Sequence, residues 1–108
     1  LPDSMAPQIS IIQTTLPEAW LEAEVGAFAQ LILEAGAACL QHSSIRSTYK
    51  WEGEIESSKE WRLQIKTSQQ HLENVLNSIR ENHPYDVPQI THWPAESNAE
   101  YADWVDSV

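Results

Sequence analysis

The sequence predicts an α+β fold in one domain over residues 1–108, with the element order β-α-β-β-α-β and an added C-terminal helix. The main observation is that the spacing of apolar residues switches between two, typical of strands, and three to four, typical of helices. The length of 108 residues suits one compact domain. Hydrophobic residues make up 42% and charged residues 20% of the chain, so an apolar core can form and disorder is not expected.

The first half of the chain is predicted to begin with a strand at Ile9–Gln13, which is short, rich in β-branched residues and bounded by prolines. An amphipathic helix is predicted from Thr15, because Thr15 and Glu18 have the spacing of a capping box. Gly36 fits the C-terminal cap of this helix. The apolar face of the helix recurs every three or four positions, at Leu21, Val25, Phe28 and Ile32.

A long β-hairpin is predicted next, turning near Gly53, because residues alternate in character over 45–52 and again over 61–66. Its predicted arms are longer than an average strand of about five or six residues, so we expect the hairpin to reach beyond the domain that carries it. The hairpin carries three aromatic residues for which one small domain offers little cover: Tyr49, Trp51 and Trp61. A second copy of the chain is therefore predicted to cover them.

The last part of the chain is predicted to form a helix, a short strand and a final helix. Thr67 and Gln70 have capping-box spacing, and Pro84 ends the helix that they begin, whose apolar face is Leu72, Val75, Leu76 and Ile79. The stretch Val87–Trp93 is expected to be extended, with prolines at its ends. Asn98 can cap the final helix, whose apolar face is Tyr101, Trp104, Val105 and Val108. This order is the split βαβ, or ferredoxin-like, arrangement.

The charge of the chain limits its partners. Six Lys and Arg residues against 16 Asp and Glu give a formal net charge of -10, which disfavours DNA, RNA and anionic membranes. No apolar run approaches the roughly 20 residues of a membrane span, and Leu1–Met5 has no export-signal pattern. The single cysteine, Cys39, cannot form an internal disulfide or a structural zinc site. These observations predict a cytoplasmic protein that binds neither nucleic acid nor membrane.

The residues that could carry chemistry favour structural roles. Four histidines suggest a metal site, but His42, His71 and His92 are predicted to be surface or core residues. His83 follows a helix and is predicted to hold its ring near the last carbonyls of that helix, with metal ligation as the alternative. Cys39 is expected to be a small buried apolar residue. The sequence has no glycine-rich phosphate loop and no spacing that indicates a catalytic triad, so we predict that the protein is not an enzyme.

Five motifs occur in a fixed order along the chain. They are Thr14-Thr15-Leu16-Pro17, Ala37-Ala38-Cys39, Ser47-Thr48-Tyr49-Lys50-Trp51-Glu52-Gly53-Glu54, Ile65-Lys66-Thr67 and His83-Pro84-Tyr85-Asp86-Val87-Pro88-Gln89-Ile90. In this order and spacing the chain resembles the CutA divalent-cation-tolerance family almost end to end. The resemblance implies a ferredoxin-like protomer in a tight homotrimer, with the long hairpin packed on a neighbour. It also implies tolerance of copper and other divalent cations, and it brings no accepted enzymatic reaction.

The resemblance implies site residues as well. The family's trimer is likened to the PII signalling proteins, which suggests a small-ligand cleft between subunits, lined here by Trp51, Glu60, Lys66 and Tyr85. The family's proposed copper ligands are a cysteine and two adjacent histidines, and the corresponding positions in this chain are Thr14, Asn82 and His83. Only His83 is a good copper ligand, so the resemblance implies at most weak binding of copper or another divalent cation there.

The function predicted first is therefore a non-catalytic homotrimer of divalent-cation tolerance and metal homeostasis that binds metal or a small ligand weakly. A PII-like signalling module with a ligand between subunits stays open as an alternative. A small hydrolase on the same fold is a second alternative, although Gln13–Leu16 offers no cation to hold a phosphate. An RNA-binding module of this topology is disfavoured by the net charge of -10.

Overall fold

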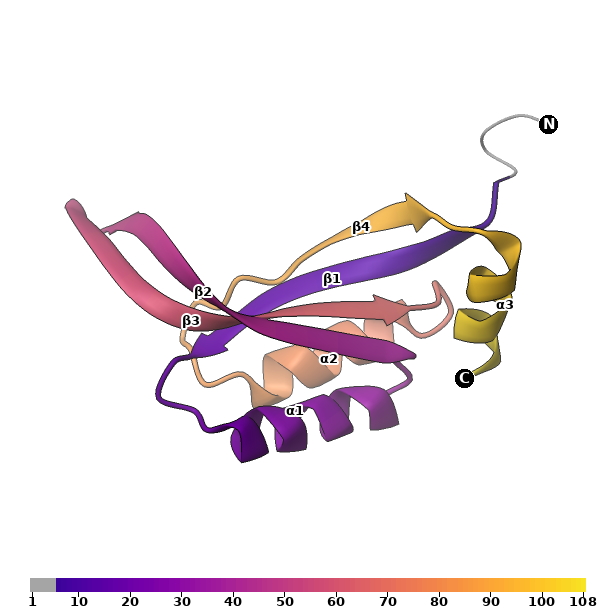
Figure 1. Ribbon diagram of the computed structural model, residues 1–108, viewed down its shortest axis with the longest axis horizontal. Coiled ribbons are helices and arrows are strands. Elements are labelled where there is room, and N and C mark those ends of the chain that lie inside the picture. The colour runs from indigo at the N-terminus through magenta and orange to yellow at the C-terminus, as the bar shows by residue number, and fades with distance from the viewer. Residues whose placement is uncertain (1–5) are drawn as a thin grey trace.

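A four-stranded antiparallel sheet in the order β2-β3-β1-β4 forms the centre of the protein in a computed structural model that describes residues 6–108 (Figure 1). The elements are β1 (Gln8–Pro17), α1 (Glu22–Glu34), β2 (Cys39–Trp51), β3 (Glu54–Thr67), α2 (Leu72–Asn82), β4 (Thr91–Glu96) and α3 (Ala99–Ser107). This is the predicted ferredoxin-like order with an added C-terminal helix. Leu1–Met5, for which no export-signal pattern was predicted, lies outside the described residues.

Strand β1 is buried on both faces, because successive side chains along a strand point to opposite sides of the sheet. Ile12 and Leu16 pack in the main core with apolar residues of α1 and α2, which cover one face of the sheet: Val25, Phe28, Ile32, Val75, Leu76 and Ile79. Ile9 and Ile11 pack in a second cluster with Ala102 and Val105 of α3. Helix α3 covers only part of this second face of the sheet. The rest of the face carries the site described below.

Helix α1 begins later than predicted. Thr15 does not cap it, because Thr15 lies in β1 and pairs with Arg62 of β3. The helix begins after Leu21, whose N–H donates to the Glu24 carboxylate at 2.9 Å. Leu21, predicted on the buried face, is exposed. Gly36 follows the helix end as predicted, with a φ of 119° that favours glycine.

Helix α2 and strand β4 also begin later than predicted. Thr67 ends β3 instead of capping α2, and Ser68 Oγ accepts the His71 N–H at 3.3 Å. The stretch Val87–Trp93 is loop up to residue 90, and β4 continues through Pro94. Because β4 is an edge strand, a residue without an N–H is tolerated in it. Pairing between distant strands thus decides the boundaries that local capping signals predicted wrongly.

The hairpin of β2 and β3 is longer than predicted, with paired residues from Cys39 and Lys66 to Trp51 and Glu54. Its twisted end projects beyond the helices (Figure 1). Trp61 is covered within its own protomer, where its indole N–H donates to the Trp20 carbonyl at 3.0 Å. The final helix follows Asn98 as predicted, although two residues predicted on its apolar face are about half exposed, Trp104 and Val108.

Candidate functional site

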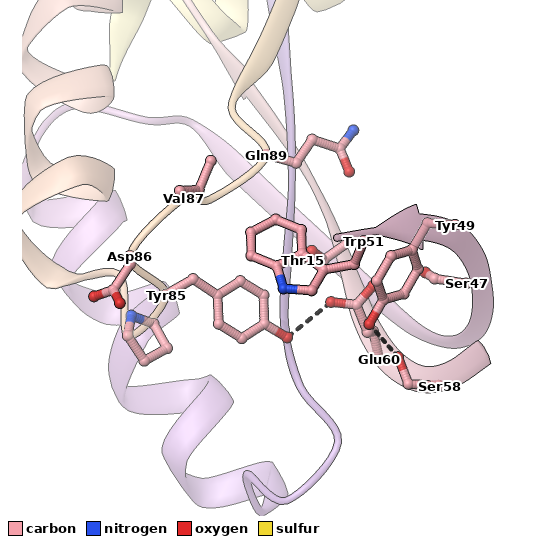
Figure 2. A pocket seen from close by; sticks show the side chains of 11 residues that line it. Thr15, Ser47, Tyr49, Trp51, Ser58, Glu60, Tyr85, Asp86, Val87 and Gln89 are labelled. Atoms are coloured by element: carbon pink, nitrogen blue, oxygen red, sulfur yellow. Dashed lines mark hydrogen bonds between the residues drawn. The ribbon is translucent and has the colours of Figure 1, made fainter. Parts of the chain in front are cut away.

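An open cleft of about 670 Å³ lies between the hairpin and the loop that follows α2. The sheet supplies one wall. The register places Ser47, Tyr49 and Glu60 on the same face as Thr15, which is the face opposite α1 and α2. The loop supplies the other wall through Tyr85 and its neighbours (Figure 2). The cleft therefore depends on the projecting hairpin, because a hairpin of ordinary length would lack the strand segment that forms the wall.

Tyr85 and Glu60 form the strongest contact across the cleft. The Tyr85 hydroxyl donates to Glu60 Oε2 at 2.7 Å, and the Trp51 and Tyr49 rings lie beside this pair (Figure 2). Burial raises the pKa of Tyr85, and its hydrogen bond to the Glu60 carboxylate raises it further. The phenol therefore keeps its proton at neutral pH and donates to a carboxylate, which is the arrangement of a strong, charge-assisted hydrogen bond.

Lys66 does not line this cleft. Its ammonium donates to Gln41 Oε1 at 2.6 Å and lies 6.0 Å from the centre of the Tyr101 ring, near the far end of β3. Three of the four residues expected around a ligand are thus brought together, namely Trp51, Glu60 and Tyr85. The ligand-binding role of all four stays a prediction.

His83 is held by both of its ring nitrogens. The Tyr85 N–H can only donate, so His83 Nδ1 accepts it at 3.1 Å and the proton of the neutral ring is on Nε2. Nε2 donates to the Thr15 carbonyl at 2.8 Å, with the Thr14 hydroxyl at 3.0 Å. His83 is the C-cap residue of α2, as predicted, but its ring bonds to β1 and not to the last carbonyls of the helix.

The pKa of His83 is consistent with this neutral ring. Burial lowers the pKa, while the bond to the Thr15 carbonyl and the charge of Glu60 oppose the shift without cancelling it. Strand β4 stops pairing with β1 at Gln13, so the Thr15 carbonyl lies beyond the end of that ladder. The His83 ring satisfies this carbonyl, where a longer β4 would otherwise have done so.

Comparisons with known proteins show the family of the chain. The family model described as "CutA1 divalent ion tolerance protein" matches residues 10–108. The chain belongs to the CutA1 divalent ion tolerance family. Over 96 residues it is 36% identical to the divalent-cation tolerance protein CutA of Pyrococcus horikoshii, a match that covers 88% of this chain and 92% of that protein.

Two further CutA proteins extend the comparison. The chloroplastic protein CutA of Arabidopsis thaliana is 36% identical over 77 residues, covering 69% of this chain and 42% of the plant protein. The solved structure of the PII-like protein CutA from Nostoc sp. PCC 7120 in apo form has a TM-score of 0.79 at 32% identity, covering 91% of this chain and 94% of that one. The predicted family, the fold and the link to divalent-cation tolerance are thus confirmed.

The positions that the CutA resemblance relates to copper do not build a closed metal site in this chain. Asn82 donates its side-chain amide to the Ser78 carbonyl at 2.8 Å and so turns back to its own helix. Thr14 is fully buried against His83, whose nitrogens are both engaged. Within residues 6–108, no group of three or more His, Cys, Asp or Glu residues could hold a metal ion. The donor set here does not fit tight copper binding.

The other titratable candidates are placed as follows. His42 lies 2.9 Å from the Glu22 carboxylate at the surface, and His92 is exposed on β4. His71, expected to be a surface or core residue, is half-buried beside Ser68. Cys39 is a half-buried free thiol.

None of the helices within residues 6–108 is long and apolar enough to cross a membrane.

Sequence reasoning did not assign Tyr49 and Asp86 to the site, although both line the cleft. A signal for Tyr49 was present, because residues two apart on a strand share a face and Tyr49 is two positions from Trp51. Asp86 lies in a loop whose path follows from tertiary contacts, so no periodicity could have placed it.

Proposed function

We propose that this CutA protein acts in divalent-cation tolerance as a non-catalytic, cytoplasmic homotrimer of one domain, and that it binds a small ligand in the cleft of Trp51, Glu60 and Tyr85. The observation that supports this most directly is the Tyr85–Glu60 bond of 2.7 Å, which fixes a charged group and an aromatic ring at the wall of an open cleft. A concave site with a few oriented polar groups among apolar ones is typical of small-molecule binding.

The proposed trimer rests on the projecting hairpin. Its end exposes large apolar side chains, with Ile55 at 74%, Trp51 at 53% and Tyr49 at 43% relative exposure. Strand β2 is an edge strand of 13 residues, and a long exposed edge is normally covered or paired. In the proposed assembly a neighbouring subunit covers the hairpin and Lys66 of the partner subunit approaches the cleft.

Metal binding in this proposal is weak. Copper or another divalent cation would use His83, and it must then displace either the Tyr85 N–H from Nδ1 or the Thr15 carbonyl from Nε2–H. The protein's contribution to cation tolerance therefore depends mainly on the cleft and not on sequestering the ion.

A ligand screen tests the proposal. Small molecules of each charge type are titrated into the wild-type trimer and into Tyr85→Phe, which keeps the ring but removes the bond to Glu60, while light scattering follows the assembly. We expect compounds that stabilise the wild type and lose affinity in Tyr85→Phe. Trp104→Phe, which alters an exposed ring of α3 outside the cleft, is the matched control. A monomer at micromolar concentration, or a library without any cleft ligand, would contradict the proposal.

A PII-like signalling module is the second candidate, favoured by the likeness to the PII-like CutA of Nostoc sp. PCC 7120. It would use the same cleft, with ligand binding altering contacts between subunits. Binding of a partner protein that depends on the cleft ligand separates it from the first candidate.

A further inference from the structure

We propose that the face of the hairpin opposite the cleft binds a short, extended acidic segment of a partner protein. This basic face is formed by the side chains that alternate with the cleft residues near the end of the hairpin: Arg46, Thr48, Lys50, Ile55, Ser57 and Lys59. The inference goes beyond the proposed function, because it concerns a second surface and does not depend on a ligand in the cleft.

The strand register brings the residues of the basic face together. Arg46 lies directly opposite Lys59, and Lys50 lies directly opposite Ile55. Arg46 Nη1 donates to Ser57 Oγ at 3.3 Å, so these two side chains share one side of the hairpin. All residues of the basic face are exposed, and the end of the hairpin projects beyond α1 and α2 (Figure 1). The helices of the same subunit therefore leave the basic face open.

The basic face concentrates positive charge in an acidic chain. It holds three of the six Lys and Arg residues, although the formal net charge of the chain is -10. None of its positions is Asp or Glu. Within residues 6–108, no carboxylate forms an ion pair with Arg46, Lys50 or Lys59. Because like charges directly opposite one another on a sheet repel, a carboxylate bound between Arg46 and Lys59 would relieve this repulsion.

Two carboxylates of the same subunit lie near the basic face without occupying it. Glu60 follows Lys59 in the sequence, but its carboxylate is on the cleft side, where it accepts the Tyr85 hydroxyl at 2.7 Å. Glu18 lines a hollow of about 340 Å³ at the base of the hairpin together with Arg46 and Lys59, and it pairs with neither of them. The positive charge is thus available to a carboxylate from outside the subunit.

The proposed trimer leaves this face accessible. A neighbouring subunit that brings its Lys66 to the cleft lies over the cleft face of the hairpin. A strand that pairs with the edge strand β2 lies in the plane of the sheet. The basic face points to the opposite side, which is the side of α1 and α2. Each trimer therefore presents three basic faces.

The spacing of the charges favours an extended segment over a compact anion. Lys50 lies four positions from Arg46 on β2, a separation of about 13 Å at about 3.3 Å per residue. A small anion reaches only one end of this row, whereas two acidic residues four positions apart in an extended peptide span it. A long nucleic acid is disfavoured, because beyond the hairpin it would meet a chain of net negative charge.

A pair of peptides tests the inference on the wild-type protein. The probe is an octapeptide of alternating Glu and Thr, and the control replaces each Glu by Gln. Exposed ion pairs each contribute little, so binding is measured by fluorescence anisotropy at low ionic strength. The Glu peptide is expected to bind about tenfold more tightly than the Gln peptide and to lose affinity as salt is added. Equal affinities of the two peptides would overturn the inference.

Three variants locate the binding. Arg46→Gln is expected to weaken binding of the Glu peptide about fivefold. Arg80→Gln, at an exposed position of α2, removes the same charge away from the hairpin and is expected to leave binding unchanged. Equal losses in these two variants would show bulk attraction and would contradict the proposed surface. Lys50→Gln is also expected to weaken binding. If it does not, and pyrophosphate displaces the peptide, the face takes a compact anion and the extended segment is wrong.

Light scattering on each variant separates this inference from the proposed function. If Arg46→Gln dissociates the trimer, the basic face is an interface between subunits, so the inference is wrong and the trimer stands. If the wild type is a monomer, the proposed assembly is wrong, while the peptide pair still decides the inference because one subunit carries the whole basic face. An oligothymidylate that binds more tightly than the Glu peptide would show that the class of partner is wrong.

Discussion

Replacing His83 by alanine tests whether this residue is a structural link and not primarily a metal ligand. In the wild type the His83 ring joins β1 to the loop of the cleft, since it donates to the Thr15 carbonyl and accepts the Tyr85 N–H. The substitution removes both bonds and leaves the Thr15 carbonyl without its side-chain partner. We therefore expect His83→Ala to be less stable and to have a looser cleft.

The structure sets the magnitude of this loss. Each of the two hydrogen bonds, at 2.8 and 3.1 Å, contributes about 1 kcal/mol net, and an unsatisfied carbonyl that is partly shielded from water costs about 1 kcal/mol more. The free energy of unfolding should therefore fall by about 2–3 kcal/mol. His92→Ala is the matched control, because His92 is exposed on β4, and it should change stability by no more than about 0.5 kcal/mol.

Urea unfolding measures the difference. Both variants and the wild type are compared at one protomer concentration, because the stability of an oligomer depends on concentration. A chelator is present throughout, so that no metal contributes. If His83→Ala is as stable as His92→Ala under these conditions, the two hydrogen bonds do not hold the loop and the structural role is refuted.

Four further predictions follow from the same contacts and conformations. Burial lowers the pKa of His83 below its usual 6.5, so the unfolded chain binds the proton more readily and urea stability should fall as the pH drops below about 6.5; a loss of equal size in His83→Ala would contradict this. Trp51→Ala should weaken the free energy of association of the proposed trimer by about 2 kcal/mol or more, measured by ultracentrifugation on dilution. An unchanged trimer population would show that Trp51 does not anchor the assembly. In calorimetry, copper(II) should bind with an affinity no tighter than about micromolar, and this binding should be lost below about pH 6. Nanomolar binding that survives His83→Ala would show that the metal site lies elsewhere. Gly36→Ala should lower the free energy of unfolding in urea by about 2 kcal/mol, because φ is 119° and a Cβ would meet His71 Cγ at 2.7 Å. A variant as stable as the wild type would show that the alanine causes no strain there.

The order of the elements could be predicted from the sequence, while their boundaries could not. The switch of apolar spacing identifies β1 and α1, yet the spacing of Thr15 and Glu18 equally suits a helix start. The long-range pairing of Thr15 with Arg62 decides for the strand. Local signals of about 1 kcal/mol lose to a ladder of many hydrogen bonds, and the sequence does not display that ladder.

The candidate site was predictable only in part, for a similar reason. Trp51, Glu60 and Tyr85 follow from the resemblance to the CutA family, and the structure brings them to one cleft. Lys66 lies near the far end of β3, because 66 and 60 are six positions apart on one extended strand. At about 3.3 Å per residue that separation is about 20 Å, more than a lysine side chain spans. Lys66 can therefore reach such a cleft only from a second subunit.

At the positions related to copper, residues far apart in the sequence lie close together in this chain, but their chemistry is that of a hydrogen-bonded link. The resemblance implies that Thr14 and His83 lie close together although 69 positions separate them, and they are 3.0 Å apart. A thiolate at position 14 would be a soft metal ligand, whereas the threonine hydroxyl is a hydrogen-bond partner. With the proton of the neutral ring on Nε2, directed to Thr14 and the Thr15 carbonyl, the nitrogen that would face a metal at this position is a donor and has no free lone pair. The same proximity that could hold copper in a relative therefore positions Tyr85 and the cleft in this protein.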